Sequence, residues 1–421
     1  MRFSDLEGRK VAVWGLGLEG RSALAELQAR GIDVTVAESD ADADVLRAAE
    51  VVVKSPGIPV TSALYGELAA SGVHFTSVTD LFLSDNAARA IGVTGTKGKS
   101  TTSSAIAHLL TYAGVPAALA GNIGASLLDA PADGTVVLEV SSYQAQSITV
   151  SPRVAVVTSL FPEHLPWHGS EEAYFADKLK LVATAEHVVV PGHDEALVAR
   201  VTQAMSADAT LHLTGDMLRA DESGLTWDGV GSIPPGELPL IGVHNARNLA
   251  LAVLAAHVAE PSLDPATLLD GVRTFAALTH RMETVPSKDG RRWIDDSLAT
   301  APEAVIAALS VFPDEPVALI LGGADRGLDL SPLADYLRTR HSPVHLLLIG
   351  PAGSRFGREH ADGLGHAVLE FGRMADAVAW GLSVANPAQV VLLSPGAPSF
   401  DEYKDYADRA RHMRELIAPA D

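Results

Sequence analysis

A glycine- and lysine-rich loop constrains the fold of this chain more than any other segment. The loop, Gly-Thr-Lys-Gly-Lys-Ser over residues 95–100, follows the apolar run Ala90–Thr94 and opens a helical segment. The strict P-loop pattern places a glycine where Val93 stands, so only its shorter form, G-x-x-G-K-S, is present. Backbone N–H groups of such a loop bind phosphate, Lys99 would neutralise the β- and γ-phosphates, and the next two hydroxyl residues are placed to reach Mg²⁺. The sequence therefore predicts ATP bound at a strand–loop–helix unit.

Short apolar runs alternate with helical segments along most of the chain, which predicts an α/β protein with parallel sheets covered by helices. The runs expected to form strands are Val11–Trp14, Val34–Ala37, Val51–Lys54, Ala90–Thr94, Val136–Val140, Val154–Leu160, Trp293–Ile294, Val317–Leu321, Val344–Ile349 and Val390–Leu393. The stretch Leu211–Pro239 differs, because its short alternating runs, rich in Gly, Asp, Thr and Pro, predict a small antiparallel sheet.

The length of 421 residues predicts two or three domains, at about 150 residues per domain. The order of the expected elements places boundaries near residues 88 and 278. We expect a Rossmann-like domain over residues 1–88 and a second Rossmann-like domain over residues 279–421. Residues 89–278 between them are expected to form a central P-loop ATPase domain with a parallel sheet and a small antiparallel sheet.

The charge balance narrows the partners that the chain can have. It carries 31 basic and 52 acidic residues, a net charge of −21, which disfavours nucleic acid or an anionic membrane as the main partner. Small anionic ligands stay open, because a few local cations can hold a phosphate. The absence of Cys excludes disulfides, thiolate zinc sites and cysteine nucleophiles. No signal-peptide pattern or membrane-spanning apolar run is found, so we expect a cytoplasmic protein.

A second glycine-rich turn, Gly15–Gly20, matches G-x-G-x-x-G directly after the run Val11–Trp14. Glu38 stands at the end of the next apolar run, where a carboxylate can bond a ribose hydroxyl. Glycines let the backbone approach a diphosphate at a helix N-terminus, so the turn indicates a nucleotide or diphosphate site. A tight strand-to-helix turn without a ligand is the alternative, and an NAD-dependent oxidoreductase stays open for this motif.

Polar residues after two further apolar runs are candidate ligands for magnesium or phosphate. Glu139 ends such a run downstream of the P-loop, where a carboxylate commonly holds Mg²⁺, with a solvated strand end as the alternative. His164 and His168 are four residues apart, but Pro166 argues against a regular helix and hence against a zinc-protease pair. Beside a nucleotide site either histidine becomes a candidate ligand, whereas alone each would be a polar loop residue.

For several other polar residues, the local sequence alone does not predict a function. Lys178 lies in a helical stretch, where a lysine is normally on a solvated face, so the residues alone assign it no role. Several later loops follow apolar runs or open a helix, and these are the usual ligand positions of parallel sheets. They contain Asn245, Asn248, Arg281, Asp295–Ser297, Gly322–Gly327 and Ser394–Phe400. Each is also compatible with a structural turn, but together they predict a cleft between domains.

Taken together, these motifs resemble those of the Mur ligase family of peptidoglycan synthesis, and most closely its MurD type, which adds glutamate to UDP-N-acetylmuramoyl-L-alanine. The resemblance covers essentially the whole chain, and its motifs are jointly specific. They are Ser55–Ile58, Thr94–Thr101, Gly121–Gly124, Glu139–Gln144, Pro162–His164, Tyr174–Leu179, His244–Asn248, His280–Arg281, Asp295–Ser297 and Ser394–Tyr406.

The resemblance implies a role for each matching residue. It implies ATP contacts at Gly95, Thr96, Lys97, Gly98, Lys99, Ser100, Thr101, Asn245, Asn248, Arg281 and Asp296. It implies two Mg²⁺ sites supported by Ser100, Glu139, His164 and Lys178, the last matching a lysine that is carbamylated in the family. It implies UDP-sugar contacts at Gly15, Leu16, Gly17, Glu19, Glu38, Ser55, Asn122 and Ser141. It implies glutamate contacts at Thr300, Arg326, Ser399, Phe400 and Tyr406. Among these, Lys99, Lys178 and His164 would be catalytic.

The chemistry implied by the resemblance is ATP-dependent amide formation by a monomer that acts on small molecules. The alanine carboxylate would attack the γ-phosphorus of ATP, and the glutamate amine would then attack the acyl phosphate. Cations must bring these negative oxygens together, which suits Lys99 and two Mg²⁺. The acyl phosphate must also be kept from water, which a third domain closing over the cleft would do.

Two departures from the family pattern bear on the glutamate enantiomer. Members that add D-glutamate commonly carry lysine where Leu298 stands, and a second lysine where Arg326 stands. The segments Phe161–Gly169 and Ser394–Phe400 look instead like those of relatives that add L-glutamate, whose product a separate enzyme epimerises. We therefore expect L-glutamate. The alternatives are the same reaction with D-glutamate, an NAD-dependent oxidoreductase, and a nucleotide-gated binding protein without ligase chemistry.

Overall fold

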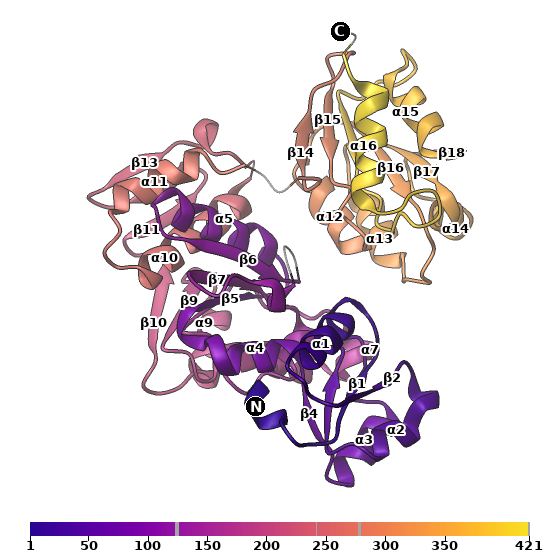
Figure 1. Ribbon diagram of the computed structural model, residues 1–421. Coiled ribbons are helices and arrows are strands. Elements are labelled where there is room, and N and C mark those ends of the chain that lie inside the picture. The colour runs from indigo at the N-terminus through magenta and orange to yellow at the C-terminus, as the bar shows by residue number, and fades with distance from the viewer. Residues whose placement is uncertain (123–125, 241, 277–278, 420–421) are drawn as a thin grey trace. The chain divides into compact units, whose positions relative to one another are not determined.

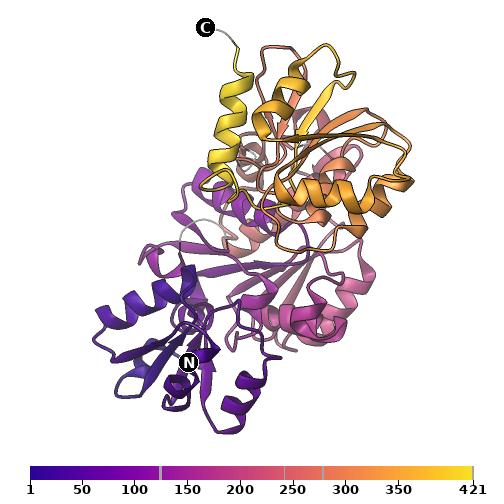
Figure 2. The same ribbon diagram turned by 90° about the vertical axis from the view of Figure 1, so that its right-hand side faces the viewer.

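The computed structural model describes residues 1–122, 126–240, 242–276 and 279–419, without the side chains of Leu18, Pro166 and Glu303. The chain forms two compact units, Met1–Ala276 and Ala277–Asp421 (Figure 1 and Figure 2). The boundary expected near residue 88 lies inside the first unit, between its two larger sheets. The division into three domains therefore stays a prediction.

The first unit begins with a four-stranded parallel sheet in the order β2-β1-β3-β4. Its strands are β1 (Val11–Trp14), β2 (Val34–Ala37), β3 (Val51–Lys54) and β4 (His74–Thr76), and its helices are α1 (Leu18–Ala29), α2 (Ala43–Arg47), α3 (Ala63–Ala70) and α4 (Val78–Asn86). β1 and β3 are buried along their whole length, as expected for continuous apolar runs. Because β2 and β3 lie on opposite sides of β1, the carboxyl ends of β1 and β3 flank a switch point, the usual ligand crevice of such sheets.

A six-stranded parallel sheet follows, in the order β10-β9-β8-β5-β7-β6. Its strands are β5 (Ala90–Thr94), β6 (Ala117–Gly121), β7 (Thr135–Glu139), β8 (Val154–Val157), β9 (His187–Pro191) and β10 (Thr210–Thr214). The helices around it are α5 (Lys99–Tyr112), α6 (Ser142–Ala145), α7 (Leu165–His168), α8 (Glu171–Leu179), α9 (Glu195–Ala204), α10 (Val243–Ala259) and α11 (Pro265–Arg273).

The alternation of side chains along the central strands divides the core of this sheet in two. Ile91 and Val93 of β5 belong to a buried cluster with Leu109 of α5 and Leu249 of α10. Val136 of the neighbouring β7 belongs to a separate cluster on the other face. Apolar side chains on both faces explain why the runs at 90–94 and 136–140 are apolar almost throughout, and both expected strands are confirmed.

The expected antiparallel sheet is present but shorter than predicted. It has three strands, β11 (Leu218–Asp221), β12 (Gly224–Trp227) and β13 (Gly231–Ile233). Leu211, where the prediction began, lies instead in β10, which pairs in parallel with β9. β10 is an edge strand that is only partly buried, so its sequence alternates much as an antiparallel strand does.

The second unit is built on a mixed sheet in the order β14-β15-β19-β16-β17-β18, in which only β14 is antiparallel to its neighbour. Its strands are β14 (Glu283–Val285), β15 (Arg292–Asp295), β16 (Val317–Gly322), β17 (Val344–Ile349), β18 (Ala367–Gly372) and β19 (Val390–Leu393). Its helices are α12 (Pro302–Leu309), α13 (Ser331–Thr339), α14 (Gly350–His360), α15 (Met374–Leu382) and α16 (Tyr406–Ile417). The four central strands were predicted, whereas the edge strands β14 and β18 were not, because half-exposed edges lack a continuous apolar run.

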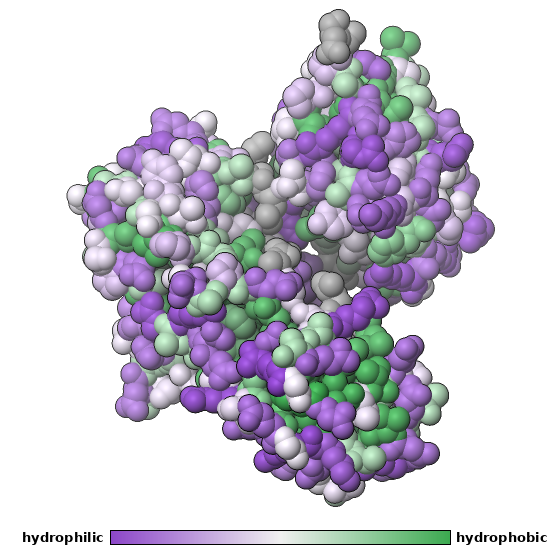
Figure 3. All heavy atoms as spheres, viewed as in Figure 1, coloured by the Kyte–Doolittle hydropathy of each residue, from purple (hydrophilic) through white to green (hydrophobic). Residues whose placement is uncertain are grey.

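The surface of each unit carries hydrophilic side chains interspersed with hydrophobic ones, as one face shows in Figure 3. The strongly apolar runs are inside, in the strands described above. Within the described residues, no helix is both long and apolar enough to cross a membrane.

Candidate active site

The glycine- and lysine-rich loop connects β5 to α5 in a conformation that glycine adopts most easily. Gly95 has φ +145° and Gly98 has φ +89°. A Cβ atom on Gly98 would lie only 2.5 Å from Oδ1 of Asn248, which is in the second turn of α10. The fold therefore brings Asn248, an expected ATP contact, directly against the loop, although the two are far apart in the sequence.

Residues that follow β8 hold the same loop from another side. Thr158 Oγ1 donates to the carbonyl oxygen of Lys97 at 2.5 Å, and Lys97 N donates to Ser159 Oγ at 3.0 Å. Lys97 Nζ also forms an ion pair with Glu163 at 2.7 Å. The strand predicted to continue to Leu160 ends earlier, and the residues after it bond the loop instead of extending the sheet.

The first turn of α5 carries the residues expected to meet phosphate and magnesium. Lys99 Nζ donates to the carbonyl oxygens of Gly95 and Thr96, each at 3.0 Å, so its side chain is folded over the loop. Ser100 and Thr101 are both buried. The first N–H groups of α5 have no partner within the helix, which makes this end of the helix an anion-binding position.

Glu139 ends β7 next to the loop, paired in register with Val93 of β5. It is only 2% exposed. Its Oε1 accepts a hydrogen bond from Asn122 Nδ2 at 2.6 Å, while Oε2 is buried and has no hydrogen-bond partner among the described residues. A buried carboxylate oxygen without a partner is costly unless a cation or water meets it, so Glu139 fits a divalent-cation ligand.

The expected contacts around Asn122 are only partly described. Asn122 was predicted to contact the UDP-sugar. In the structure its side chain donates a hydrogen bond to Glu139. The remainder of its motif, Gly121–Gly124, includes Ile123 and Gly124, which lie outside the described residues.

His164 and His168 lie at the two ends of a one-turn helix, α7, and differ sharply. His164 is the N-cap, with φ +57°, and its side chain is well exposed, 5.1 Å from the ring of Tyr143 between centroids. Pro166 was expected to prevent a regular helix, and only this single turn forms; proline is tolerated there because first-turn N–H groups lack helical partners anyway. His168 is buried, with both ring nitrogens bonded to protein, so it is not available as the phosphate or magnesium ligand that we considered.

Lys178 is the residue whose position is least expected from its sequence context. It is 2% exposed, and its Nζ donates to the carbonyl oxygen of Gly95 at 2.7 Å. Burial, and then the nearby positive charge of Lys99, lower the pKa of Lys178 well below its ordinary value, so the neutral amine is favoured. Lys178 therefore does not lie on a solvated helix face, which is the usual position of a helical lysine.

The second glycine-rich turn lies where β1 meets α1, at the switch point of the first sheet. Gly15 has φ +85°, and a Cβ atom on Gly20 would lie 1.9 Å from the carbonyl oxygen of Gly15. Ser55 Oγ donates to that same oxygen at 2.7 Å, which ties the loop after β3 to the turn. Leu16 and Gly17 continue the turn toward the start of α1. Four of the expected UDP-sugar residues are therefore brought together here.

Two other expected UDP-sugar contacts are Glu19, which is bonded to α6 from the first turn of α1, and Ser141, which caps α6. Gln144 Nε2 donates to Glu19 Oε1 at 2.5 Å, and burial raises the pKa of Glu19. Ser141 is the N-cap of α6, and its Oγ accepts from Gln144 N at 3.2 Å. Glu38, by contrast, is exposed at the end of β2, with no contact to the other expected UDP-sugar residues among the described hydrogen bonds and ion pairs.

In the second unit, Asp296 follows β15 and is buried against the loop after β19. Ser394 Oγ donates to its Oδ2 at 2.7 Å, and Met282 N donates to its Oδ1 at 3.3 Å. Burial raises the pKa of Asp296 to about 7. The hydrogen bond from Ser394 and the positive charge of Arg281 act in the opposite direction and limit the rise. The two expected ATP contacts of this unit, Arg281 and Asp296, therefore influence each other electrostatically.

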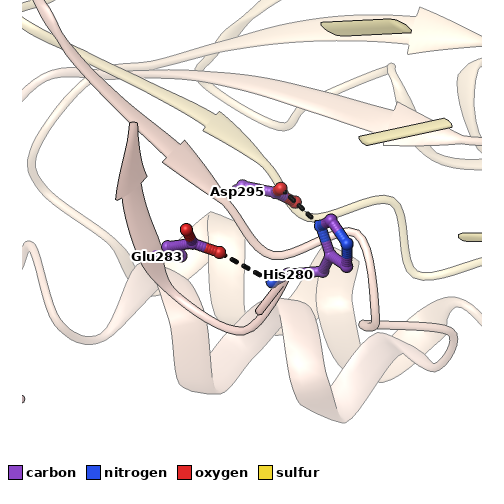
Figure 4. A group of neighbouring side chains, drawn as sticks. All are labelled: His280, Glu283 and Asp295. Carbon is purple, nitrogen blue, oxygen red and sulfur yellow. Dashed lines mark hydrogen bonds and ion pairs between the residues drawn. The ribbon is translucent and has the colours of Figure 1, made fainter. Parts of the chain in front are cut away.

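The turn that carries Arg281 is held by a group of three titratable residues, His280, Glu283 and Asp295, shown in Figure 4. His280 Nδ1 is 2.7 Å from Asp295 Oδ2, and the backbone N–H of His280 donates to Glu283 at 3.0 Å. Their ligand atoms are close enough to hold a metal ion, but Arg414 already bonds both carboxylates, to Asp295 at 2.7 Å and to Glu283 at 2.5 Å. The guanidinium supplies the positive charge there, so this group is an ion-pair network rather than a metal centre.

The residues expected to hold glutamate surround the same end of the sheet. Thr300 is exposed just before α12, Ser399 is buried, and Tyr406 opens α16 with its ring 5.9 Å from that of His280. The guanidinium of Arg326 lies 5.8 Å from the ring centroid of the exposed Phe400. Both side chains are therefore available at the surface of the second unit.

Arg409 is a residue of this region that the sequence analysis missed. It is 1% exposed and donates to Ser297 Oγ at 3.0 Å, to Ser297 O at 2.8 Å and to Ala397 O at 3.1 Å. It thus joins the loop after β15 to the loop after β19. On α16, Arg409 directly precedes Ala410, which is buried together with Met413. This position beside the buried helix face is the signal in the sequence that could have identified Arg409.

A glycine-rich loop between a central parallel strand and a helix, with a carboxylate at the end of the adjacent strand, defines a phosphate-binding site of the P-loop class on an α/β fold. Residues 93–256 match the family model of the Mur ligase middle domain, and residues 280–396 match that of the Mur ligase, glutamate ligase domain. The chain belongs to the Mur ligase family, and the expected resemblance is confirmed.

Relatives of known name are similar over the whole chain. The chain is 41% identical to UDP-N-acetylmuramoyl-L-alanine--L-glutamate ligase of Salinispora tropica, over 100% of this chain and 99% of the relative. It is 36% identical to the protein of that name from Xanthomonas axonopodis, over 99% of this chain and 96% of the relative.

Solved structures show the same fold at low sequence identity. The UDP-N-acetylmuramate-alanine ligase MurC of Thermotoga maritima matches with a TM-score of 0.59 and 18% identity, covering 97% of this chain and 98% of that one. MurF ligase of Thermotoga maritima, solved in complex with ADP, matches with a TM-score of 0.57 and 18% identity, covering 97% and 95%. The expected α/β fold class is confirmed.

Proposed function

We propose that this protein is an ATP-dependent ligase that joins L-glutamate to UDP-N-acetylmuramoyl-L-alanine through an acyl phosphate, in the synthesis of peptidoglycan precursors. The observation that carries the proposal is the convergence at one loop of Lys99, Glu139 and Lys178, each from a different element. Full-length similarity to relatives named as L-glutamate ligases supports this reaction and this enantiomer. Membership of the family does not favour an NAD-dependent oxidoreductase.

We assign one reactant to each proposed domain. Residues 1–88 would bind the UDP-sugar at the switch point flanked by Gly15 and Ser55, because a glycine-rich turn at a helix N-terminus suits a diphosphate. Residues 89–278 would bind ATP at the loop between β5 and α5. Residues 279–421 would bind glutamate through Thr300, Arg326, Ser399, Phe400 and Tyr406. We also propose that the enzyme works as a monomer.

The residues around the loop suit a site for ATP with divalent magnesium. The partnerless oxygen of Glu139, the hydroxyl of Ser100 and the exposed imidazole of His164 are the oxygen and nitrogen donors available to hold the ion. Bound there, magnesium would supply charge neutralisation to the phosphates. Asn245 and Asn248 at the start of α10 would meet the nucleotide from the other side of the loop, and we propose nucleotide contacts for Arg281 and Asp296 as well.

Lys178 is proposed to carry a carbamate. A neutral lysine amine adds to carbon dioxide, forming an N–C bond and releasing one proton, and the product is an anion. Burial of Lys178 lowers the pKa of its amine, which favours the neutral form that this reaction needs. The resulting carboxylate would add a negative group beside Lys99 and would give the site an oxygen donor that no unmodified lysine offers.

In the proposed reaction the chain's own residues bind, orient and neutralise. The loop N–H groups and Lys99 would hold the γ-phosphate while an alanine carboxylate oxygen forms a bond to phosphorus and ADP leaves. The acyl phosphate would then lose phosphate as the glutamate nitrogen bonds the acyl carbon and gives up a proton.

The test is an assay of phosphate release with ATP, Mg²⁺, UDP-N-acetylmuramoyl-L-alanine and either enantiomer of glutamate. We expect turnover that requires all components and is faster with L-glutamate. Faster turnover with D-glutamate would overturn the enantiomer but not the ligase. Absence of turnover with both enantiomers, with ATP still bound, would favour a nucleotide-gated binding protein.

A further inference from the structure

A chain of three hydrogen-bonded side chains lies inside the first unit and has no role in the assignments above. His168 Nδ1 is 2.8 Å from Oδ2 of Asp177, and His168 Nε2 is 3.0 Å from Oγ of Ser142. The side chain of His168 is 0% exposed, and Ser142 is 2% exposed. The imidazole therefore connects a serine hydroxyl to a carboxylate within the protein interior.

Aromatic rings enclose the same imidazole and fix its plane. The ring of Tyr143 stacks on it at 5.7 Å between centroids and 5° between planes. Trp167 lies edge-on at 4.5 Å and Tyr174 edge-on at 5.2 Å. The packed rings and the two hydrogen bonds together restrict the orientation of the His168 ring. An orientation that breaks either hydrogen bond would leave a buried polar atom without a partner, at a cost of about 1–3 kcal/mol.

A serine, histidine and aspartate bonded in this order are also the arrangement of nucleophilic hydrolases. Here Ser142 is only 2% exposed, so an ester or amide substrate has no approach to its hydroxyl. Both ring nitrogens of His168 are therefore bonded to structural partners, and His168 does not activate a nucleophile. Its effect must be exerted through the elements that it joins.

Each of the three joined elements contains, or lies within a few residues of, one of the residues proposed to hold or support magnesium. Ser142 opens α6, three residues after Glu139. His168 ends α7, whose N-cap is His164. Asp177 directly precedes Lys178 in α8. The bonds of one imidazole therefore fix the spacing of three segments that are separate in the sequence.

We propose that His168 is a positioning residue that holds Glu139, His164 and Lys178 in the arrangement that binds the divalent cation. The proposal rests on the proposed function, because these three residues must first be the groups that bind or support the cation. Lys180 Nζ, 3.0 Å from Asp177 Oδ1 and bonded also to the carbonyl oxygen of Gln146, reinforces the same junction between α8 and the segment after α6.

The experiment compares the full-length protein with His168→Gln and His168→Asn, each of which keeps at most one of the two hydrogen bonds. Binding of Mn²⁺ in the presence of ADP is measured by electron paramagnetic resonance, independently of turnover. We expect both variants to bind Mn²⁺ at least about tenfold more weakly, about 1.4 kcal/mol. In the ligase assay, KM for Mg²⁺ should rise by a similar factor while KM for glutamate stays within about twofold.

The matched control is His366→Gln in the second unit. His366 also bonds from both ring nitrogens, accepting from Val344 N at 3.4 Å and lying 2.9 Å from Leu337 O, but it has no place in the proposed site. It should leave Mn²⁺ binding unchanged. If the His168 variants also leave it unchanged, or raise both KM values equally, the positioning role is overturned.

A second variant covers the case in which the His168 variants do not fold. Asp177→Asn is isosteric, keeps the buried shape and removes the charge that orients the imidazole, so we expect weakened Mn²⁺ binding in the same direction. Unchanged binding in a folded Asp177→Asn protein would overturn the proposal. A wild-type protein that binds no Mn²⁺ with ADP would contradict the proposed function itself, which separates the two failures.

Discussion

The side-chain amine of Lys178 donates to the carbonyl oxygen of Gly95 at 2.7 Å, so a helix lysine touches the phosphate-binding loop from inside the protein. The contact links α8 to the loop between β5 and α5, and both residues are buried. A charged amine in this position would stand beside Lys99 in a poorly solvated space, which is why the pKa of Lys178 is lowered. This environment favours a reactive neutral amine next to the predicted nucleotide.

Lys178→Ala is expected to fold and to lose at least about 100-fold in turnover, about 2.7 kcal/mol of transition-state stabilisation. The reason is the loss of the anion that the carbamate would supply. Steady-state phosphate release measures the effect, and added formate or acetate should partly restore activity by replacing that anion. Lys10→Ala, at an exposed lysine, is the control. Near-normal turnover of Lys178→Ala would remove Lys178 from the mechanism.

Gly98→Ala is expected to weaken nucleotide binding at least about tenfold, about 1.4 kcal/mol. Gly98 has φ +89°, and the added Cβ would lie 2.5 Å from Asn248 Oδ1, so the loop or α10 must shift. Gly114→Ala at the other end of α5 is a matched control, because Gly114 has φ +85° and open space around it. Calorimetry with ADP compares the two variants. An affinity of Gly98→Ala equal to that of Gly114→Ala would contradict the expected effect of the contact with Asn248.

Arg409→Ala is expected to destabilise the second unit by about 3 kcal/mol, because buried acceptors on Ser297 and Ala397 lose their donor. Arg411→Ala on the same helix is the control. Arg411 has a 64% exposed side chain and forms surface ion pairs with Asp408 and Glu415, so its loss should cost much less than the loss of Arg409. Urea unfolding measures both values. A cost for Arg409→Ala no larger than for Arg411→Ala would mean that the two loops do not depend on this guanidinium.

Asp296 should make stability fall as pH rises through the acidic range. Burial raises the pKa of Asp296 to about 7, whereas an unfolded aspartate has a pKa of about 4. Between these values the folded protein binds the additional proton, so the free energy of unfolding decreases from about pH 4 to about pH 7 and this contribution is constant outside the window. Asp296→Asn lacks the titration. The stability difference, variant minus wild type, should therefore grow by up to about 4 kcal/mol across the window.

Urea unfolding of both proteins at several pH values from about 4 to about 8 tests this difference. Asp325→Asn, at an exposed aspartate of the same unit, is the comparison, because its pKa is lowered by the bond to Arg355 rather than raised. Its stability difference should not grow with pH in the direction expected for Asp296. Parallel stability curves for wild type and Asp296→Asn would contradict the expected titration.

Apolar runs and glycine-rich turns were sufficient to predict most central strands and the phosphate-binding loop, although the interior strand β9 was missed. A strand buried on both faces has a continuous apolar sequence, and a turn with positive φ selects glycine, so both are visible locally. The edge strands β14 and β18 were not predicted because one side of each is open and their residues are partly polar. β10 was assigned to the wrong sheet for the same reason.

The sequence by itself determined the α/β class, the loop that suits phosphate and the motifs that identify the family, because these depend on local residue order. Only the tertiary structure decided that Lys178 is buried against Gly95, that His168 bonds inward while His164 is exposed, and that Arg409 joins two loops. A polar residue in a helix or loop has the same local sequence whether it faces solvent or the interior. Its role is fixed by which distant elements the sheets bring next to it.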